Sequence, residues 1–188
     1  MEVRGISIDP ILFEKKKGKK ENLDKSIEPK IPKKRVITTT ENWRFSSEQL
    51  NPIKQLEYIF HLQDKICEDG EGSCRFIKQQ IQQKLGGYKA QDIKKEKYDE
   101  SLFIKHSEVL QLMIKTENLC FYCNEKVHVL YENVREPKQW TLERMDNDKG
   151  HNTDNVTIAC LNCNLRRRTM HHERYLFTKQ LNIIKMDT

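Results

Sequence analysis

The sequence has no run of about 18 apolar residues, which is the length that a membrane-spanning helix needs. Its first residues also lack the apolar stretch and the small-residue cleavage pattern of a secretory signal. We therefore expect a soluble, intracellular protein that is neither secreted nor bound to a membrane. Hydrophobic residues make up 36% of the 188 residues and charged residues 33%, which leaves too little apolar material for a second large core.

Cysteine is also scarce for a secreted disulfide scaffold, because the chain has only six. In the reducing compartment expected for an intracellular protein, thiols persist, and paired cysteines favour metal binding over disulfides. Cys67 and Cys74 have no Cys-x-x-Cys partner, and we interpret both as free thiols near helix ends. The other four cysteines form two Cys-x-x-Cys pairs, which carry the strongest chemical signal in the chain.

Most of the excess positive charge lies in residues 1–40. This segment has eleven Lys/Arg and six Asp/Glu, so it contributes +5 of the net charge of +6. Lysines cluster at 15–20, basic residues recur at 33–35, and no helical or strand periodicity is present. We predict a basic disordered tail. Three roles stay open for it: a solvated tail without function, an arm that binds nucleic acid, and a nuclear localisation signal.

Residues 41–117 show the apolar spacing of helices and are predicted to form a helical scaffold. Ser46 followed three residues later by Gln49 resembles a capping box, which predicts that a helix begins there. That helix is expected to end near residues 67–70.

Two further helices are predicted in this region. One, through residues 76–85, is expected to stop at Gly86 and Gly87, and the other is expected to follow a cap at Ser101. The lysine-rich stretch 89–97 between them is predicted to be a link that faces solvent or phosphate.

Residues 118–188 contain the two Cys-x-x-Cys pairs, each of which can direct two thiolates at one tetrahedral ion. The predicted ligands of a zinc ion are Cys120, Cys123, Cys160 and Cys163. A site closed by four thiolates has no open position for water. The predicted zinc ion is therefore structural and does no cutting.

The stretch between the pairs predicts a small α/β arrangement. Residues 140–145 and 155–159 alternate like strands, residues 146–154 are polar, and a helix is expected from about Leu161. The predicted fold class is α+β, with a helical N-terminal scaffold followed by a zinc-stapled module of strand, loop, strand and helix.

This module resembles the HNH endonucleases of the ββα-metal superfamily that carry a four-cysteine zinc site. The resemblance covers residues 118–170, and four segments carry it: Leu142-Glu-Arg-Met-Asp-Asn147, Lys149-Gly-His151, Asp154-Asn-Val156 and Cys160-x-x-Cys-Asn164. More loosely, the segment Gly87-Tyr-Lys-Ala-Gln-Asp92 is similar to HNH-containing proteins of large DNA viruses. That second similarity implies a virus-associated location, whereas a nuclear location would follow from a localisation signal in the basic tail.

The resemblance implies a metal-dependent endonuclease that hydrolyses phosphodiester bonds in DNA. It implies that Glu143 and Asn164 bind a catalytic Mg²⁺ or Mn²⁺ ion, and that Asn155 supports the active-site loop. The family's water-activating histidine is replaced by Arg144. A guanidinium stays protonated and cannot take a proton from water, so Arg144 is expected to clamp phosphate.

Another residue must then activate water. His151 is preferred because imidazole titrates in the useful range, and Asp146 is a second candidate on the same strand face as Arg144. Each also has an ordinary explanation, His151 as a surface-loop side chain and Asp146 as a turn cap. Four arginines are predicted to contact the nucleic-acid backbone: Arg166, Arg167, Arg168 and Arg174.

Two other classes of protein stay in competition. A catalytically degenerate HNH-fold zinc protein would bind nucleic acid without cutting it, because Arg144 has replaced the family histidine. A zinc-ribbon interaction protein would fit the four cysteines alone, but it would leave the strand and loop pattern and the arginine run unexplained.

Overall fold

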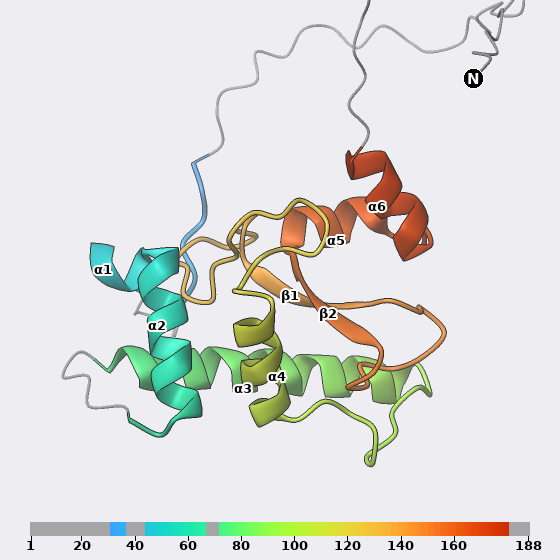
Figure 1. The fold of residues 1–188 in the computed structure, drawn as a ribbon, viewed down its shortest axis with the longest axis horizontal. Helices are drawn as coiled ribbons and strands as arrows, with labels where there is room; N and C mark the ends of the chain where they lie inside the picture. The colour runs from blue at the N-terminus through green and yellow to red at the C-terminus, as the bar shows by residue number, and fades with distance from the viewer. Residues whose placement is uncertain (1–30, 37–43, 67–71, 181–188) are drawn as a thin grey trace, which may run out of the picture. The chain divides into compact units, whose positions relative to one another are not determined.

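The computed structural model describes residues 31–36, 44–66 and 72–180 (Figure 1). The described elements are α1 (Ser47–Leu50), α2 (Pro52–Gln63), α3 (Ser73–Lys94), α4 (His106–Lys115), β1 (Trp140–Arg144), β2 (Val156–Cys160), α5 (Leu161–Arg167) and α6 (His172–Gln180). Helices with one two-stranded sheet confirm the α+β class. Within these residues, no helix is both long enough and apolar enough to cross a membrane.

The single helix predicted after Ser46 begins at the expected place. It is interrupted at Asn51, however, so that it forms the two helices α1 and α2. The Ser46 side chain accepts a hydrogen bond from the Gln49 amide at 3.2 Å, and the Gln49 side chain accepts one from the Ser46 amide at 3.0 Å. This confirms the capping box, but it caps only the short α1. Asn51 caps α2, because its side chain accepts from Ile53 N at 2.9 Å, and α2 ends at Gln63.

Helix α3 continues through Gly86 and Gly87, so the predicted stop is wrong. A Cβ at either glycine would meet nothing within 4 Å, which places both on an open face of the helix. An interior glycine costs a helix about 1 kcal/mol relative to alanine. Burial of Ile77 and Ile81, both 0% exposed, outweighs that cost. Most of the predicted link 89–97 is therefore helical.

Helix α4 begins later than predicted, at His106. Its N-cap residue is Lys105, whose amide donates to the Glu108 carboxylate at 2.7 Å. Ser101 caps nothing there, since its amide and hydroxyl both donate to Asp99. The predicted cap at Ser101 is therefore wrong.

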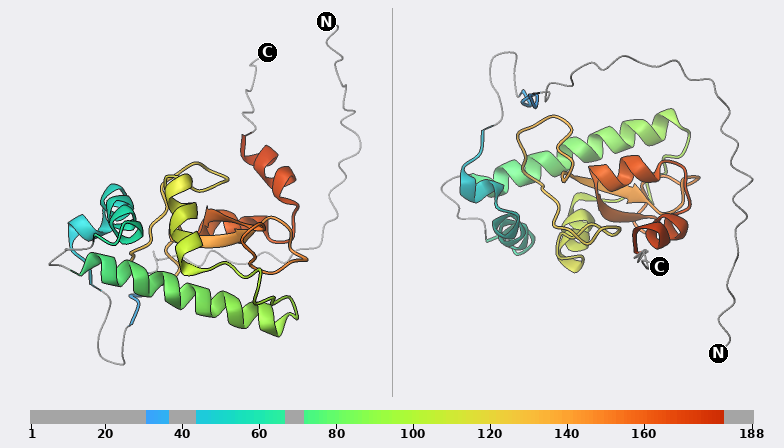
Figure 2. Two further views of the ribbon diagram at one scale, coloured as in Figure 1. Left: turned by 60° about the horizontal axis from the view of Figure 1, so that its bottom comes forward. Right: turned by 90° about the horizontal axis from the view of Figure 1, so that it is seen from above.

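The predicted order of strand, loop, strand and helix is confirmed. Strands β1 and β2 pair antiparallel, with Trp140 opposite Cys160 and Arg144 opposite Val156. Helix α5 follows β2 directly, and the long α3 passes beside the sheet in both views of Figure 2. The strands are more buried than their alternation suggested, because all of β2 and all of β1 except Arg144 are buried.

One hydrophobic core joins the helical scaffold to the cysteine-containing module. It includes Ile59 of α2, Ile77 of α3, Val109 of α4, Trp140 of β1 and Tyr175 of α6. The described parts of regions 41–117 and 118–188 therefore share one core.

Part of the predicted disordered tail is ordered. Lys34 forms a β-bridge with Asn133, and the Arg35 guanidinium donates to Tyr131 O at 2.9 Å and to the Gln80 side chain at 2.6 Å. The tail prediction is wrong for this segment, because these contacts tie it to the folded unit. Residues 1–30 and 37–40 lie outside the described residues.

Cys74 lies in the first turn of α3, where it is 3% exposed. It is disulfide-bonded, so the interpretation as a free thiol is wrong at this position. Cys67 lies outside the described residues.

Candidate functional site

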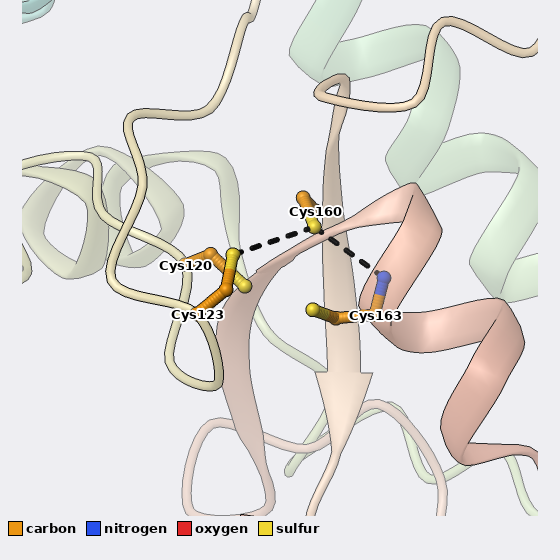
Figure 3. A group of neighbouring side chains, drawn as sticks. All are labelled: Cys120, Cys123, Cys160 and Cys163. Atoms are coloured by element: carbon orange, nitrogen blue, oxygen red, sulfur yellow. Dashed lines mark hydrogen bonds between the residues drawn. The ribbon is translucent and has the colours of Figure 1, made fainter. Parts of the chain in front are cut away.

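The four predicted zinc ligands converge on one point (Figure 3). Their sulfur atoms all lie within 4.8 Å of one another, and Cys123 Sγ is 3.9 Å from Cys160 Sγ. A tetrahedral zinc ion with Zn–S bonds of about 2.3 Å requires sulfur atoms roughly 3.8 Å apart. The spacing of the cluster therefore fits one zinc ion.

Backbone hydrogen bonds bring the two cysteine pairs together. The first pair sits on a tight turn, in which Cys120 N donates to Glu125 O and Asn124 N donates to Cys120 O. Phe121 N then donates to Ile158 O of β2 at 2.8 Å. The second pair lies where β2 passes into α5, with Cys163 N donating to Cys160 Sγ at 3.4 Å. An ion in this cluster would pin the start of α5 to the upstream turn.

The pKa values of the cysteine thiols also indicate a site for a cation. A hydrogen bond from Cys160 lowers the pKa of the Cys120 thiol to about 5, while the same bond and burial raise the pKa of Cys160. Burial raises the pKa of Cys163 to about 11. Four thiols this close together, three of them buried, cannot all ionise without a compensating positive charge. Zinc supplies that charge, so the donor set fits a structural zinc site.

A pocket of about 250 Å³ opens among α3, β1 and α5. Four of the predicted catalytic residues line it: Glu143, Arg144, His151 and Asn164. They come from separate parts of the sequence, on the end of β1, in the following loop and on α5. The fold thus gathers them around one cavity.

Glu143 is held at this pocket by a buried ion pair. Its side chain is 5% exposed and that of Arg167 is 1% exposed, and the Arg167 guanidinium donates a hydrogen bond to Glu143 Oε1. The same guanidinium donates to the backbone oxygens of Arg144 at 2.8 Å and Met145 at 3.0 Å. Burial raises the pKa of Glu143, and the hydrogen bond from Arg167 opposes that shift.

The role predicted for Arg167 is therefore wrong. Its guanidinium is buried and donates its hydrogen bonds to groups of the protein, so it cannot contact a nucleic-acid backbone. Arg166, Arg168 and Arg174 are exposed, and Arg168 also lines the pocket. For these three arginines, contact with the nucleic-acid backbone stays a prediction.

Asn164 lines the same pocket as Glu143. Its Nδ2 donates to Thr141 Oγ1 at 3.2 Å, and the Thr141 hydroxyl donates in turn to Ala159 O at 2.8 Å. Among the described residues, no protein donor reaches Asn164 Oδ1 or Glu143 Oε2. One carboxylate oxygen and one amide oxygen are ligands suited to a magnesium ion that keeps several of its waters. Glu143 and Asn164 are the two lining residues that the resemblance assigns to a divalent cation.

His151 is buried, and this excludes the interpretation as a surface-loop side chain. It is 3% exposed, and Asp92 of α3 accepts two hydrogen bonds from it: from the backbone amide at 2.6 Å and from ring Nδ1 at 2.9 Å. Tyr88 stacks on the ring, with the centroids 4.4 Å apart. Burial lowers the pKa of His151, and Asp92 partly opposes that shift. The ring is therefore neutral around pH 7.

Gly150 allows this close approach of the loop to α3. A Cβ at this position would lie 2.4 Å from Lys97 O and 3.0 Å from Asp92 Oδ2. Real Cβ atoms do not approach backbone so closely, so a side chain here would push the loop away from α3. Position 150 therefore requires glycine, because no side chain fits between the loop and α3.

Arg144 and Asn155 brace the loop between the strands. The Arg144 guanidinium donates to Lys149 O at 3.1 Å and lines the pocket. Asn155 Nδ2 donates to Asp146 O and Gly150 O, both at 2.9 Å, and Asn155 Oδ1 accepts from Asp146 N at 2.9 Å. This agrees with the loop-supporting role that the resemblance implies for Asn155.

Asp146 belongs to the turn and lies outside the pocket. It is exposed, and its Oδ1 accepts from the Asp148 amide at 2.8 Å, which is the turn-capping arrangement. It does not line the pocket that holds Glu143 and His151. The structure therefore gives Asp146 a local structural role, and His151 is the stronger candidate for activating water.

Sequence reasoning assigned no role to Asp92 or Tyr88. Both lie in the segment that carried the looser resemblance, and a spacing of four residues places them on the same face of α3. That spacing of an aromatic and a carboxylate was the available signal. It identified no partner, because His151 is 59 residues away in the chain.

Comparison with known proteins adds no assignment for this site. No protein-family model matches the chain, and neither a curated protein nor a solved structure does.

Proposed function

We propose that this protein is a metal-dependent HNH-type endonuclease that hydrolyses phosphodiester bonds in DNA. The observation that carries the proposal is the pocket, which is lined by a buried carboxylate at Glu143, an amide at Asn164 and a neutral histidine at His151. These are the residue types that metal-assisted phosphodiester hydrolysis uses. The four-cysteine cluster nearby would keep α5, and with it Asn164, in place against β2.

His151 is the residue proposed to activate water. With Nδ1 engaged by Asp92, its Nε2 can accept a proton, and no protein group among the described residues occupies that nitrogen. As the proton passes to Nε2, the water oxygen forms a bond to phosphorus. The bond from phosphorus to the leaving nucleotide oxygen then breaks, that oxygen takes a proton from solvent, and His151 releases its own proton to solvent.

Positive charge at the pocket would hold the phosphate. Arg144 and Arg168 both line the cavity, so a phosphodiester placed there would lie next to two arginines. Because each stays charged at any working pH, they can stabilise the extra negative charge of the transition state. Arg166 and Arg174 would contact flanking phosphates from the exposed surface.

Glu143 and Asn164 would hold a Mg²⁺ or Mn²⁺ ion, whose charge would help to neutralise the scissile phosphate. Arg167 has a supporting part in this arrangement. By donating to Oε1, it fixes the Glu143 carboxylate and leaves Oε2 for the cation. The ion pair also limits the negative charge that the protein itself presents to DNA.

The same ion pair favours a second candidate, an HNH-fold zinc protein that binds DNA without cutting it. If Arg167 neutralises Glu143 completely, the carboxylate attracts no cation, and the pocket becomes a phosphate-binding surface. The two candidates share the zinc site and the exposed arginines. They differ in whether a divalent cation changes the covalent state of the DNA.

The deciding experiment incubates the zinc-loaded protein with supercoiled plasmid, with and without Mg²⁺ or Mn²⁺. The endonuclease proposal expects nicked or linear DNA only with the cation, and loss of that product in Glu143→Ala. Asp148→Asn is the matched control, because it removes a carboxylate whose side chain is 99% exposed in the same region. DNA binding without any cleavage of duplex, branched or single-stranded DNA would support the second candidate.

A further inference from the structure

We propose that Asp92 positions His151 for proton transfer, so that the long helix α3 contributes to the active site and does more than support it. The inference rests on the proposed function, because it names a positioning residue for the same site. Asp92 is 0% exposed, and its two carboxylate oxygens accept from two different groups of His151. A single side chain thereby fixes both the backbone and the ring of the histidine.

This arrangement sets the protonation pattern of the ring. The backbone amide of His151 can only donate, and it takes Asp92 Oδ2 at 2.6 Å. Asp92 Oδ1 at 2.9 Å is an acceptor as well, so the ring must present Nδ1–H to it. The neutral imidazole then has its free lone pair on Nε2. That is the tautomer needed to take a proton from water.

Tyr88 restricts the ring from one side. Its ring lies against the His151 ring at an interplanar angle of 30°, and its hydroxyl accepts from Leu142 N of β1 at 3.1 Å. The hydroxyl is therefore tied to the strand that carries Glu143. The ring of His151 therefore packs against a side chain that is hydrogen-bonded to the residue directly before the proposed cation ligand.

Several charged groups act on His151 from the surrounding elements. Asp92 of α3, Lys95 directly after α3 and Arg144 of β1 act on its ring, and two further charged residues, Glu143 of β1 and Arg168 after α5, line the same pocket. Asp92 favours the protonated ring, whereas Arg144 and Lys95 disfavour it. Asp92 is the one group among them that is in hydrogen-bond contact with the ring.

Asp92→Asn is the most informative substitution, because an amide can accept only through its single oxygen. The His151 amide still needs an acceptor, so the Asn oxygen is expected to stay on it and the NH₂ group to face Nδ1. A ring nitrogen facing a donor must carry the lone pair, which moves the proton to Nε2. The variant should therefore hold the histidine in the tautomer that cannot accept a proton from water.

The first test is direct observation of the ring by ¹⁵N NMR on zinc-loaded protein with labelled imidazole. The wild-type spectrum is expected to show His151 as the Nδ1–H tautomer, and Asp92→Asn as the Nε2–H tautomer. His151→Ala identifies the signal, and Asp148→Asn, which changes the same charge on an exposed residue, should leave it unchanged. An Nε2–H tautomer in the wild type would overturn the proposal, even if Asp92→Asn failed to fold.

The second test measures cleavage and binding for the same proteins. Asp92→Asn is expected to lower the cleavage rate on the order of a hundredfold or more, with the DNA dissociation constant and zinc content unchanged. Its remaining activity should persist to lower pH than that of the wild type, because Asp92 raises the pKa of His151. Asp92→Glu should restore part of the rate, since a carboxylate can still accept from Nδ1.

The failures of the two proposals are distinguishable. A wild-type protein that binds DNA but never cleaves it refutes the proposed function, and the imidazole spectrum still decides whether Asp92 sets the tautomer. A wild-type protein that cleaves DNA, together with an Asp92→Asn variant of equal rate and equal pH profile, refutes the positioning role alone.

Discussion

The guanidinium of Arg167 donates a hydrogen bond to the carboxylate of Glu143 in a place where both side chains are at most 5% exposed. The pair connects α5 to the end of β1, so it joins the helix that carries Asn164 to the strand that carries Glu143. Removing one member leaves the other charge buried and without its partner. Such a loss typically costs about 3–5 kcal/mol.

Arg167→Ala is therefore expected to lower the free energy of unfolding by about that amount in urea denaturation. Arg166→Ala is the control, because the neighbouring arginine is exposed and its loss should change stability by no more than about 0.5 kcal/mol. Equal effects of the two substitutions would contradict the buried position of Arg167.

The cysteine cluster predicts one tightly bound zinc ion per chain. Because its four sulfur atoms join an upstream turn to the start of α5, the metal should contribute folding free energy on the order of 10 kcal/mol. Elemental analysis of purified protein should give one zinc, and a strong chelator should abolish the cooperative thermal transition until zinc is returned. A metal-free protein, or Cys160→Ser with an unchanged transition, would be incompatible with this site.

Two glycines should respond in opposite directions to substitution by alanine. Gly150→Ala would place a Cβ 2.4 Å from Lys97 O, so it should destabilise the protein by more than about 2 kcal/mol and separate His151 from Asp92. Gly86→Ala adds a methyl group with nothing within 4 Å in the interior of α3, so it should stabilise by up to about 1 kcal/mol. Denaturant titrations of both variants check the sign, and a stabilised Gly150→Ala would show that the loop does not pack against α3.

DNA binding should depend on the exposed arginines. Substituting Arg166, Arg168 or Arg174 by alanine should reduce the slope of log K against log salt by about 0.9 for each phosphate contact that is lost. Arg75→Ala is the control, because this exposed arginine lies at the other end of α3 from the pocket residues Tyr88 and Gln91. Slopes that change equally for the control would indicate only a general effect of net charge.

Local patterns in the sequence predicted the parts of the site whose determinants are close together in the chain. The two Cys-x-x-Cys pairs identified the four sulfur atoms that cluster, and strand alternation placed β1 and β2 to within a residue at each end. Both signals depend on short spacing. Helix ends were predicted less well, because tertiary packing carries α3 through Gly86 and Gly87.

The remainder of the site depends on contacts between distant parts of the chain. The partner of His151 is Asp92, and the partner of Glu143 is Arg167. In the sequence, Arg167 stands between Arg166 and Arg168 and resembles a third exposed arginine. No local pattern distinguishes a buried arginine from an exposed one beside it. The distinction appears only when β1 and α5 pack together.

The proposed role of His151 is to take a proton from water during DNA cleavage. The most direct test of this role compares the cleavage rates of wild-type protein and His151→Ala at equal occupancy of plasmid, with Mg²⁺ or Mn²⁺ present. The wild-type rate should be on the order of a hundredfold higher or more, with similar dissociation constants. It should also be constant around neutral pH and fall only at pH values below 6.5, because burial lowers the pKa of His151 from 6.5 and protonation removes the acceptor. Equal rates for the two proteins, or no cleavage by the wild type under any of these conditions, would contradict the account.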